Sequence, residues 1–422
     1  MKISASIGCD VLVVGAGPAG SMAAARLARA GLDVLVVDKA TFPRDKLCGD
    51  FLTPGSLKLL ADNDLIDAAL AARPAVLSGM SLHVDETIVL LPFPSGSIGW
   101  SLGRRDLDAG LVRAARSAGA RVMEGFRVEA LEDTGLEVIA TGSGGVTGPL
   151  TIGARFAIDA GGRNALTPRK RRWHRPAAWP VRYAVGAWFD GVRGLSDRGE
   201  MHVLGGGASG YIGVSPIGPG LAGAAAVVGA RLFESARHDA RGLLMRLIGS
   251  SAALRRRFAG ARAVTSTRGA GPLAHGASRY GENRIVIAGD AAAFVDPFTG
   301  EGIHAALLGG IMASRAAQAV LRGATAASPP IVDFERGLRS ALLPRFTVSR
   351  LLQGVLSAPP IARRVALALS RRSDLAEALI AVTGGCREPR SLLDPSFLRP
   401  LLLESAGWRS AAAAPAGGEA MR

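Results

Sequence analysis

The sequence predicts an α/β protein in which a parallel, doubly wound sheet is interrupted by an antiparallel sheet and followed by helices. Three observations support this prediction. Residues 10–38 follow the order strand, glycine-rich turn, helix, strand. Residues 283–321 contain another strand that ends in a glycine turn before a helix. Between about residues 168 and 268, the alternation of strands and helices gives way to successive antiparallel runs.

The first segment has the pattern of a nucleotide-binding unit. Val11–Val14 is an apolar, β-branched run, as expected for a buried parallel strand. Pro18–Ala30 predicts a helix that ends at Gly31, and Val34–Val37 predicts the next strand. A strand, a helix and a parallel strand in this order form the unit that binds dinucleotides.

Three glycines lie between the first strand and the helix at the G-x-G-x-x-G spacing. Gly15 permits a tight turn, Gly17 lets the backbone approach a pyrophosphate, and Gly20 lets the helix pack closely on its strand. The helix start at Pro18 and Ala19 offers free N–H groups and a partial positive charge to the phosphates. The motif therefore predicts a bound dinucleotide.

An acidic residue ends the second strand of this unit. Asp38 stands where a carboxylate can accept both hydroxyl groups of an adenosine ribose, and Lys39 follows it. We expect both residues to contact the nucleotide.

The composition indicates a globular protein, because 48% of the residues are hydrophobic and 20% are charged. The formal net charge of +15 raises the possibility of nucleic-acid binding, but the arginines are spread along the whole chain, so we expect no nucleic-acid partner. The one dense basic cluster is Arg169–Arg172 with Arg175. A solvated loop is the favoured interpretation, and attraction of a cofactor phosphate is the alternative.

The cysteines and the apolar runs predict a cytoplasmic protein. Cys9, Cys48 and Cys386 lie far apart without C-x-x-C spacing, so they predict neither a disulfide framework nor a zinc site. The nucleotide motif begins by Asp10, which leaves no room for a signal peptide. Apolar runs are short, so a transmembrane helix is not expected.

The loop that follows Asp38 is rich in proline, glycine and charge, and it contains Lys46-Leu-Cys-Gly49. A loop that leaves the carboxyl edge of such a sheet can reach a bound cofactor. The combination resembles the geranylgeranyl-reductase-like branch of the FAD-dependent oxidoreductases with a p-hydroxybenzoate-hydroxylase fold, in which a P-x-x-K-x-C-G segment lines the flavin. The resemblance implies that Lys46, Cys48 and Gly49 contact FAD. A solvated connection with a buried cysteine is the alternative.

Two further segments resemble motifs of the same family. Gly103-Arg-Arg-Asp-Leu-Asp108 opens a helix that runs to Ser117, and the resemblance places Arg105 at the linker region of the cofactor. An ordinary salt bridge in the first helical turn is the alternative for Arg105. The strand Phe156–Asp159 ends in Asp-Ala-Gly-Gly, which resembles the family's D-G motif with alanine in place of the first glycine. Asp159 and Gly161 would then lie close to the first glycine turn.

The second anchor of the resemblance is the segment 283–303. Gly289 and Asp290 directly follow the strand expected over Ile285–Ala288, and Asp290 would bind the ribityl chain. The D-P-x-x-G-x-G string at 296–302 leads into a helix expected over Ile303–Leu321. Backbone N–H groups at this helix start can stabilise negative charge on a reduced flavin. The positions expected to contact FAD here are Pro297, Gly300, Gly302 and Ile303, and the catalytic candidates are Cys48, Pro297 and Gly300.

The family fold implies a Rossmann-like FAD-binding domain, an inserted antiparallel β-sheet substrate domain and a C-terminal helical region. The expected FAD-binding parts are 1–75, 95–167 and 268–330, the substrate parts 76–94 and 168–267, the helical region 331–408 and a disordered tail 409–422.

The remaining pattern predicts individual elements of these domains. A hairpin is expected over Val76–Phe93, a meander of short strands over residues 126–152, and one outer helix over Phe233–Ile248. The C-terminal helices are expected to break at Pro344 and at Pro359. We favour ordinary packing for these helices, over a role in covering the substrate or in peripheral contact with a membrane.

The histidines show no metal spacing, so no metal is expected, and His275 and His304 are candidates for a proton donor. The cofactors implied are FAD and, as its reductant, NADPH or NADH. The expected substrate is a hydrophobic small molecule, and the pattern does not predict the oligomeric state.

Three functional hypotheses remain. We favour an NAD(P)H-driven monooxygenase acting on a polyketide-like or aromatic molecule, because Tyr211–Ile217 lacks the tryptophan that the reductases place there. A reductase of isoprenoid double bonds is the alternative suggested by Lys46–Gly49. A non-catalytic flavin-binding scaffold is the third. Halogenation is disfavoured because no W-x-W-x-I-P string occurs.

Overall fold

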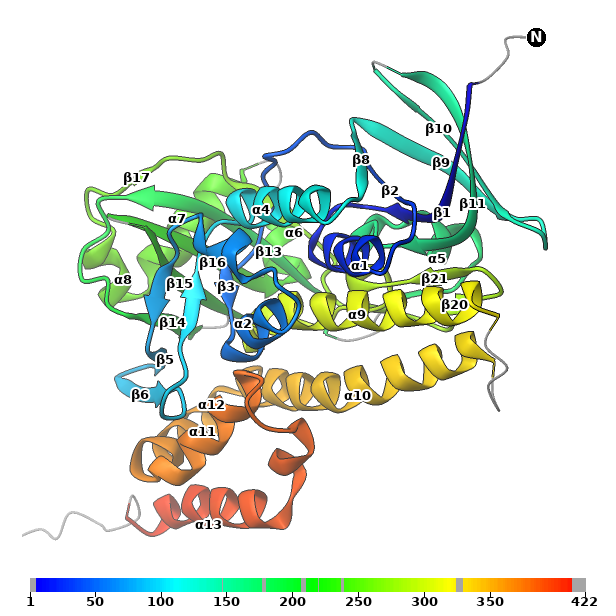
Figure 1. Ribbon diagram of the computed structural model, residues 1–422. Helices are drawn as coiled ribbons and strands as arrows, with labels where there is room; N and C mark the ends of the chain where they lie inside the picture. The colour runs from blue at the N-terminus through cyan, green and yellow to red at the C-terminus, as the bar shows by residue number, and fades with distance from the viewer. Residues whose placement is uncertain are drawn as a thin grey trace, which may run out of the picture.

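The computed structural model describes residues 5–145, 147–176, 180–205, 210–218, 220–236, 239–323 and 329–411. Two large sheets lie side by side, and helices cover their outer faces (Figure 1). The α/β fold predicted from the sequence is therefore confirmed.

The first sheet has a parallel core in the order β21-β11-β1-β2-β8, with antiparallel strands added at the edges. Its strands are β1 (Ala5–Val14), β2 (Val34–Asp38), β8 (Arg121–Glu124), β9 (Phe126–Asp133), β10 (Val138–Gly144), β11 (Gly148–Asp159), β20 (Gly281–Glu282) and β21 (Ile285–Ile287). Helices α1 (Pro18–Arg29), α4 (Arg104–Ser117) and α9 (Gly302–Leu321) contribute to the hydrophobic core that includes Val11 and Val13. The alternate side chains Leu12 and Leu35 pack with Phe126 of the meander.

The second sheet is largely antiparallel and runs in the order β17-β13-β16-β15-β14-β5-β6. Its strands are β5 (Gly79–Val84), β6 (Thr87–Pro92), β13 (Arg182–Asp190), β14 (Arg198–Leu204), β15 (Gly210–Gly218), β16 (Leu221–Gly229), β17 (Arg262–Ala263) and β18 (Arg268–Ala270), which pairs with β13. The hairpin β5–β6 joins this sheet because β5 pairs in parallel with β14. One face is covered by α7 (Ala240–Ser250) and α8 (Ala252–Arg257), and the other face lines a cavity.

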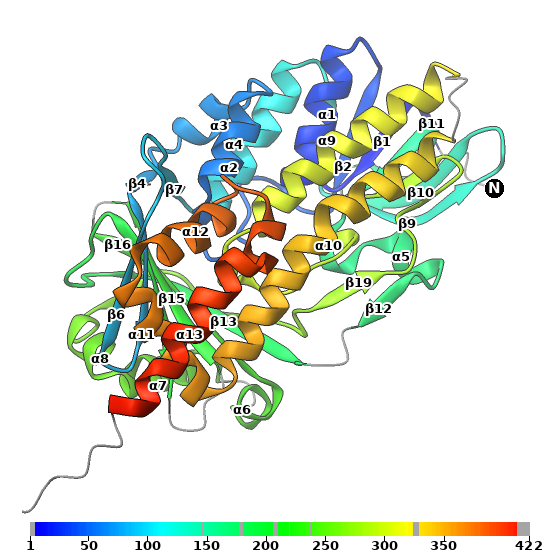
Figure 2. The same cartoon turned by 90° about the horizontal axis from the view of Figure 1, so that it is seen from below.

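Short elements connect the sheets, and helices close the molecule from below, as Figure 2 shows. The connecting elements are β3 (Phe51–Leu52), α2 (Pro54–Ala61), α3 (Ile66–Leu70), β4 (Ala75–Leu77), β7 (Gly99–Ser101), η1 (Gly162–Asn164), α5 (Leu166–Lys170), β12 (His174–Pro176), α6 (Ala230–Ser235), β19 (His275–Ala277), η2 (Gly289–Ala291) and η3 (Pro297–Thr299). The lower helices are α10 (Pro330–Leu356), α11 (Pro359–Arg371), α12 (Ser373–Thr383), η4 (Pro389–Leu393) and α13 (Pro395–Ala411).

Several expected boundaries are wrong. The single helix expected over Phe233–Ile248 is divided into α6 and α7, and the Asp239 side chain caps the start of α7 by accepting the Gly242 N–H. Pro344 lies inside the continuous helix α10, because buried Leu342 and Val348 on either side hold that helix against its neighbours. The third meander strand and the strand before Asp159 form one long strand, β11.

The predicted tail begins at residue 409, but α13 extends to Ala411, and residues 412–422 lie outside the described residues. Within the described part of the chain, no helix combines the length and the hydropathy needed to span a membrane.

Candidate active site

A cavity of about 910 Å³ lies between the two sheets. Its polar part is formed by the carboxyl ends of β1, β2 and β11, by the loop 44–49 and by the turn after β21. Its apolar part is formed by the inner face of the second sheet and by α10 and α12. The apolar part includes Phe51, Met80, Leu82, Leu91, Phe93, Met201, Tyr211, Phe294, Phe298, Leu352, Leu379 and Ile380.

The glycines of the first turn have the geometry that a pyrophosphate site needs. Gly15 has φ +100°, and a Cβ there would lie 2.5 Å from the Ala160 carbonyl oxygen. A Cβ on Gly20 would lie 1.8 Å from the Gly15 carbonyl oxygen, so this glycine permits the close contact between α1 and its strand. Gly17 lines the cavity, and a Cβ there would meet only the end of the Arg44 side chain, at 3.8 Å. The space beside Gly17 is therefore available to a ligand.

Asp38 lies at the end of β2 and lines the cavity. Its two carboxylate oxygens accept hydrogen bonds from the backbone N–H groups of Ala16 and Ala40, each at 2.8 Å. Asp38 thus connects the glycine turn to the second strand by hydrogen bonds. The remaining lone pairs of the same carboxylate can accept hydrogen bonds from a ribose. Lys39, Pro18 and the helix start also line the cavity.

We expect Asp38→Ala to weaken FAD binding by about 1–3 kcal/mol, the usual contribution of hydrogen bonds to a charged group. The carboxylate orders the Ala16 turn and faces the cavity, so its loss affects the adenosine end of the cofactor. Titration of the apoprotein with FAD measures the effect. A dissociation constant equal to that of the unaltered protein would show that Asp38 has only a local structural role.

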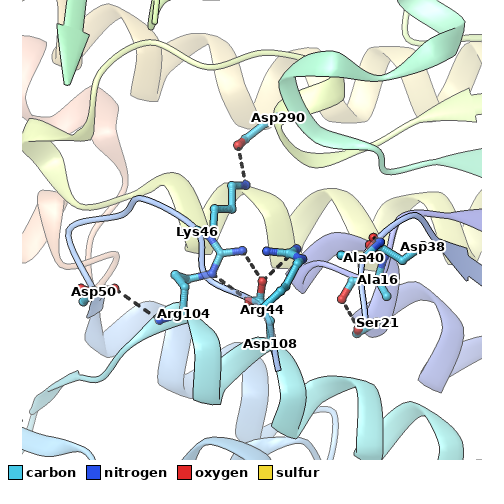
Figure 3. Close-up of polar contacts among 10 residues, drawn as sticks. All are labelled: Ala16, Ser21, Asp38, Ala40, Arg44, Lys46, Asp50, Arg104, Asp108 and Asp290. Carbon is cyan, nitrogen blue, oxygen red and sulfur yellow. Dashed lines mark hydrogen bonds and ion pairs between the residues drawn. The ribbon is translucent and has the colours of Figure 1, made fainter. Parts of the chain in front are cut away.

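Two acidic residues from the later motifs, Asp159 and Asp290, also line the cavity. Asp159 is fully buried and accepts hydrogen bonds from the backbone N–H groups of Gly161 (3.0 Å) and Thr167 (2.7 Å), so it shapes the turn after β11. Asp290 forms an ion pair with Lys46 at 3.3 Å (Figure 3). Burial opposes ionisation of Asp290, but the positive charges of Lys46 and Arg104 lower its pKa below the usual value. Asp290 is therefore a carboxylate at neutral pH.

Arg104 lines the cavity, in contrast to Arg105, which the sequence favoured. Arg104 is 5% exposed and forms two hydrogen bonds of 2.8 Å with Asp108, which also lies 3.1 Å from Arg44 (Figure 3). Arg105 does not line this cavity; its side chain is 51% exposed and pairs with Asp45 at 3.8 Å. The contact between Arg105 and the cofactor stays a prediction, and the arginine of this motif that lines the cavity is its neighbour Arg104.

The loop 296–302 approaches the cavity from below. Asp296 accepts the Phe298 N–H at 2.9 Å and the Tyr211 O–H at 2.5 Å, so it connects this loop to β15 of the second sheet. Gly300 has φ +69°, and a Cβ there would lie 2.6 Å from the Phe51 ring. Pro297, Gly300, Gly302 and Ile303 all line the cavity, as do Gly289 and Gly49.

Cys48 lines the cavity as part of the loop 44–49. Burial raises the pKa of the Cys48 thiol, so the sulfur is protonated at neutral pH. The neighbouring Asp50 is 3% exposed, and it accepts the Trp188 Nε1–H at 2.7 Å. Asp50 was not among the sequence candidates, because nothing in the motif distinguishes it from an exposed loop carboxylate.

The two histidines proposed as proton donors do not line this cavity. His304 is buried against the backbone of Gly55 and Gly385, and burial lowers its pKa to about 3, so it is neutral. Both ring nitrogens of His275 face backbone carbonyl groups, those of Leu273 (3.1 Å) and Asp290 (2.7 Å).

Among the described residues, the fold brings together two histidines and a glutamate whose spacing along the chain shows no metal-binding pattern. His83, His202 and Glu200 place potential ligand atoms within 4.8 Å of one another, because β5 pairs with β14. Arg257 binds both carboxylate oxygens of Glu200, at 2.5 Å and 2.8 Å. The buried carboxylate is thus already neutralised by a cation, and a divalent ion would add uncompensated positive charge. We therefore interpret this group as a structural ion pair.

These features define a dinucleotide-binding flavoprotein fold, and comparisons with known proteins identify its family. The family described as FAD binding domain matches residues 8–196. Menaquinone reductase of Mycobacterium tuberculosis (strain H37Rv) is 35% identical over 325 residues, which cover 72% of this chain and 75% of that protein. The flavin-dependent halogenase armH3 of Armillaria mellea is 29% identical over 370 residues, 76% of this chain and 70% of its own length.

Solved structures show the same fold. A flavoprotein/dehydrogenase from Cytophaga hutchinsonii superimposes with a TM-score of 0.84 at 21% identity, covering 96% of this chain and 100% of that one. The flavin-dependent halogenase CmlS gives a TM-score of 0.77 at 21% identity, covering 96% and 78%. The chain belongs to the FAD-dependent oxidoreductases with a p-hydroxybenzoate-hydroxylase-type fold, and it is an FAD-dependent enzyme.

The residues present fit FAD. The turn at Gly17 leaves room for a pyrophosphate at a helix start, and Asp38 is placed for the adenosine ribose. Arg44, Arg104 and Arg163 also line the cavity, although the sequence motifs did not predict them. The i, i+4 spacing of Arg104 and Asp108 was the signal available for Arg104.

Proposed function

We propose that this FAD-dependent oxidoreductase reduces a carbon–carbon double bond in a hydrophobic, isoprenoid-containing small molecule. The observation that carries the proposal is the continuity of the cavity. Its polar part contains the nucleotide motifs, its apolar part includes Leu352 of α10 with Leu379 and Ile380 of α12, and Cys48 lines the same cavity.

The apolar part suits a chain of isoprene units. Phe51, Phe93, Met201, Leu352 and Leu379 offer aromatic and aliphatic surface without charge. A site of this kind binds by apolar burial, with few polar groups that would fix a small polar substrate. One relative is named menaquinone reductase, and menaquinone is a quinone with an isoprenoid tail, which supports a substrate of this class.

FAD, when bound and reduced, supplies a pair of electrons and a proton to the substrate as a hydride equivalent. The chain supplies the rest. Asp38, Lys46 and Asp290 would bind and orient the cofactor, backbone N–H groups of the loop 296–302 would stabilise its negative charge, and the apolar wall would exclude water. The Cys48 thiol, which burial keeps protonated, is the proposed donor of the proton to the second carbon of the double bond. NADPH or NADH is the proposed reductant of the cofactor.

Oxygenation of a polyketide-like or aromatic molecule is the second candidate. Tyr211 lies in β15 at the position where the geranylgeranyl reductases that this sequence resembles have a tryptophan. Its hydroxyl group donates a hydrogen bond to Asp296. An apolar cavity wall is also what an oxygenation reaction needs to exclude water. The two candidates differ in whether oxygen is consumed.

Anaerobic reoxidation of the reduced enzyme distinguishes the two reactions. Holoenzyme is reduced with dithionite and mixed without oxygen with a short-chain menaquinone or with geranylgeraniol. Return of the oxidised flavin spectrum with geranylgeraniol, which has no quinone ring, supports double-bond reduction. Reoxidation that requires oxygen with every substrate tested contradicts it.

We expect Cys48→Ser to retain FAD and its reduction by NAD(P)H, but to slow the anaerobic reaction with the unsaturated substrate at least about tenfold, because serine is a much weaker acid than cysteine at similar size. Stopped-flow absorbance measures both half-reactions. In an oxygenase the same variant would instead release more hydrogen peroxide, because a more polar pocket admits water. Unchanged rates in both assays would show that Cys48 takes no part in the reaction.

A further inference from the structure

A second, small cavity lies on the other side of the loop that contains Cys48. It has a volume of about 40 Å³, and its wall includes Cys48, Asp50, Trp188 and Thr265. A water molecule needs about 10–15 Å³ of such volume, so the cavity has room for water. Cys48 and Gly223 line both cavities. The loop is therefore a thin wall between the substrate cavity and a water-sized cavity.

Asp50 places a carboxyl group at this wall. Its Oδ2 accepts the Trp188 Nε1–H at 2.7 Å, and its Oδ1 accepts the backbone N–H of Arg104 at 3.3 Å. A Cβ on Gly223 would lie 3.2 Å from Oδ2, so the carboxyl group also contacts β16. Asp50 has a backbone φ of +55°, which is uncommon for a residue other than glycine. The backbone of Asp50 in turn forms a hydrogen bond with the Cys48 thiol.

The charged groups around Asp50 are already paired with one another. On α4, the Arg104 guanidinium binds Asp108, and on the loop itself Lys46 binds Asp290. Asp45 pairs with Arg268 and Arg105 at the rim of the small cavity. Among the described residues, Asp50 forms hydrogen bonds but no ion pair. Burial raises the pKa of Asp50 to about 7, although the Trp188 hydrogen bond and Arg104 act in the opposite direction.

We propose that the Asp50 carboxyl group reprotonates Cys48 after each turnover, and that water in the small cavity returns a proton to Asp50. The proposal rests on the proposed reduction, which adds a hydride equivalent to one carbon and a proton to the other. The Cys48 S–H gives its proton to the second carbon, and the Asp50 carboxyl group reprotonates the thiolate. Asp50 then regains a proton from water, so the double bond gains two hydrogen atoms and both residues return to their starting state.

The sign of the pH dependence follows from this role. Asp50 must carry its proton to act, so the rate falls as the pH rises through its pKa of about 7. Trp188→Phe removes a hydrogen bond that favours the carboxylate, so it raises this pKa and moves the fall in rate to higher pH. Asp50→Asn keeps an acceptor for Trp188 but has no proton to give. It should lower the rate about 100-fold and abolish the pH-dependent fall.

The test combines single-turnover kinetics with a direct measurement of the carboxyl group. Reduced holoenzyme is mixed anaerobically with geranylgeraniol at several pH values, for the unaltered protein, Asp50→Asn, Trp188→Phe and the control Asp106→Asn, which changes an exposed carboxylate of α4 that lines neither cavity. Infrared spectra of the oxidised holoenzyme without substrate are recorded over the same pH range. We expect a carboxylic-acid band that disappears on titration near neutral pH and is missing in Asp50→Asn.

A pH profile displaced to higher pH in Trp188→Phe, a flat one in Asp50→Asn and an unchanged one in Asp106→Asn support the relay, since a purely structural Asp50 would neither displace nor abolish the pH dependence. A pH profile of Asp50→Asn equal to that of the unaltered protein overturns it, as does the absence of the titrating band. If geranylgeraniol does not reoxidise even the unaltered enzyme, the proposed reaction fails for that substrate, and the infrared titration alone decides whether Asp50 holds a proton near neutral pH.

Discussion

Gly17→Val is expected to yield a folded protein that does not bind FAD. The added side chain would enter the space beside the start of α1, where nothing but the end of Arg44 comes within 4 Å. The chain can therefore fold around the valine, but the pyrophosphate cannot approach the backbone. Flavin absorbance of the purified protein and the circular dichroism spectrum measure cofactor loss and folding separately.

Two other glycine substitutions serve as controls for this prediction. Gly20→Val places a Cβ 1.8 Å from the Gly15 carbonyl oxygen, so it should disrupt folding itself. Gly8→Val in β1 has free space around it and should leave FAD bound. A yellow, fully occupied Gly17→Val protein would place the cofactor elsewhere in the cavity.

Arg104→Ala is expected to destabilise the protein by about 3–5 kcal/mol, the cost of removing one partner from a buried ion pair. Asp108 has no exposed surface, and its remaining cation is Arg44 at 3.1 Å. Because the same arginine lines the cavity, the loss should also weaken FAD binding. Urea denaturation of the apoprotein isolates the effect on stability.

The neighbouring arginine provides a matched control. Arg105 is about half exposed and pairs with Asp45 at 3.8 Å, so Arg105→Ala should change stability by no more than about 1 kcal/mol. Equal effects of the two substitutions would contradict the assignment of Arg104 as the buried partner.

The parts of the candidate site that are local in the chain could be derived from the sequence. The predictions for the G-x-G-x-x-G turn, Asp38, Gly289-Asp290 and the loop 296–302 depend on short motifs, and residues of each motif line one cavity. The motif at the start of α4 indicates where that helix begins, but not which of two adjacent arginines its first turn buries, and the structure buries Arg104.

Features that depend on strand pairing were not predictable from local patterns. His83 and His202 stack with ring centroids 4.1 Å apart because of the parallel register between β5 and β14. Trp188 reaches Asp50 because β13 lies against the loop after β2. Such contacts join residues more than a hundred positions apart, and no spacing in the chain marks them.

The continuous helix α10 shows the limit of proline as a boundary signal. Proline removes one helical hydrogen bond, which usually ends or bends a helix. In α10, buried side chains precede and follow Pro344, and tertiary packing outweighs the local cost.

The measurement that tests the central claim most directly is the mass of the product after one anaerobic turnover. Reduced holoenzyme is mixed with a short-chain menaquinone, the products are exposed to air so that any hydroquinone returns to quinone, and their masses are determined. Double-bond reduction predicts a product that keeps two added hydrogen atoms after air exposure. Recovery of the unaltered quinone, together with a product that gains an oxygen atom when the reaction is run in air, would contradict the proposed function.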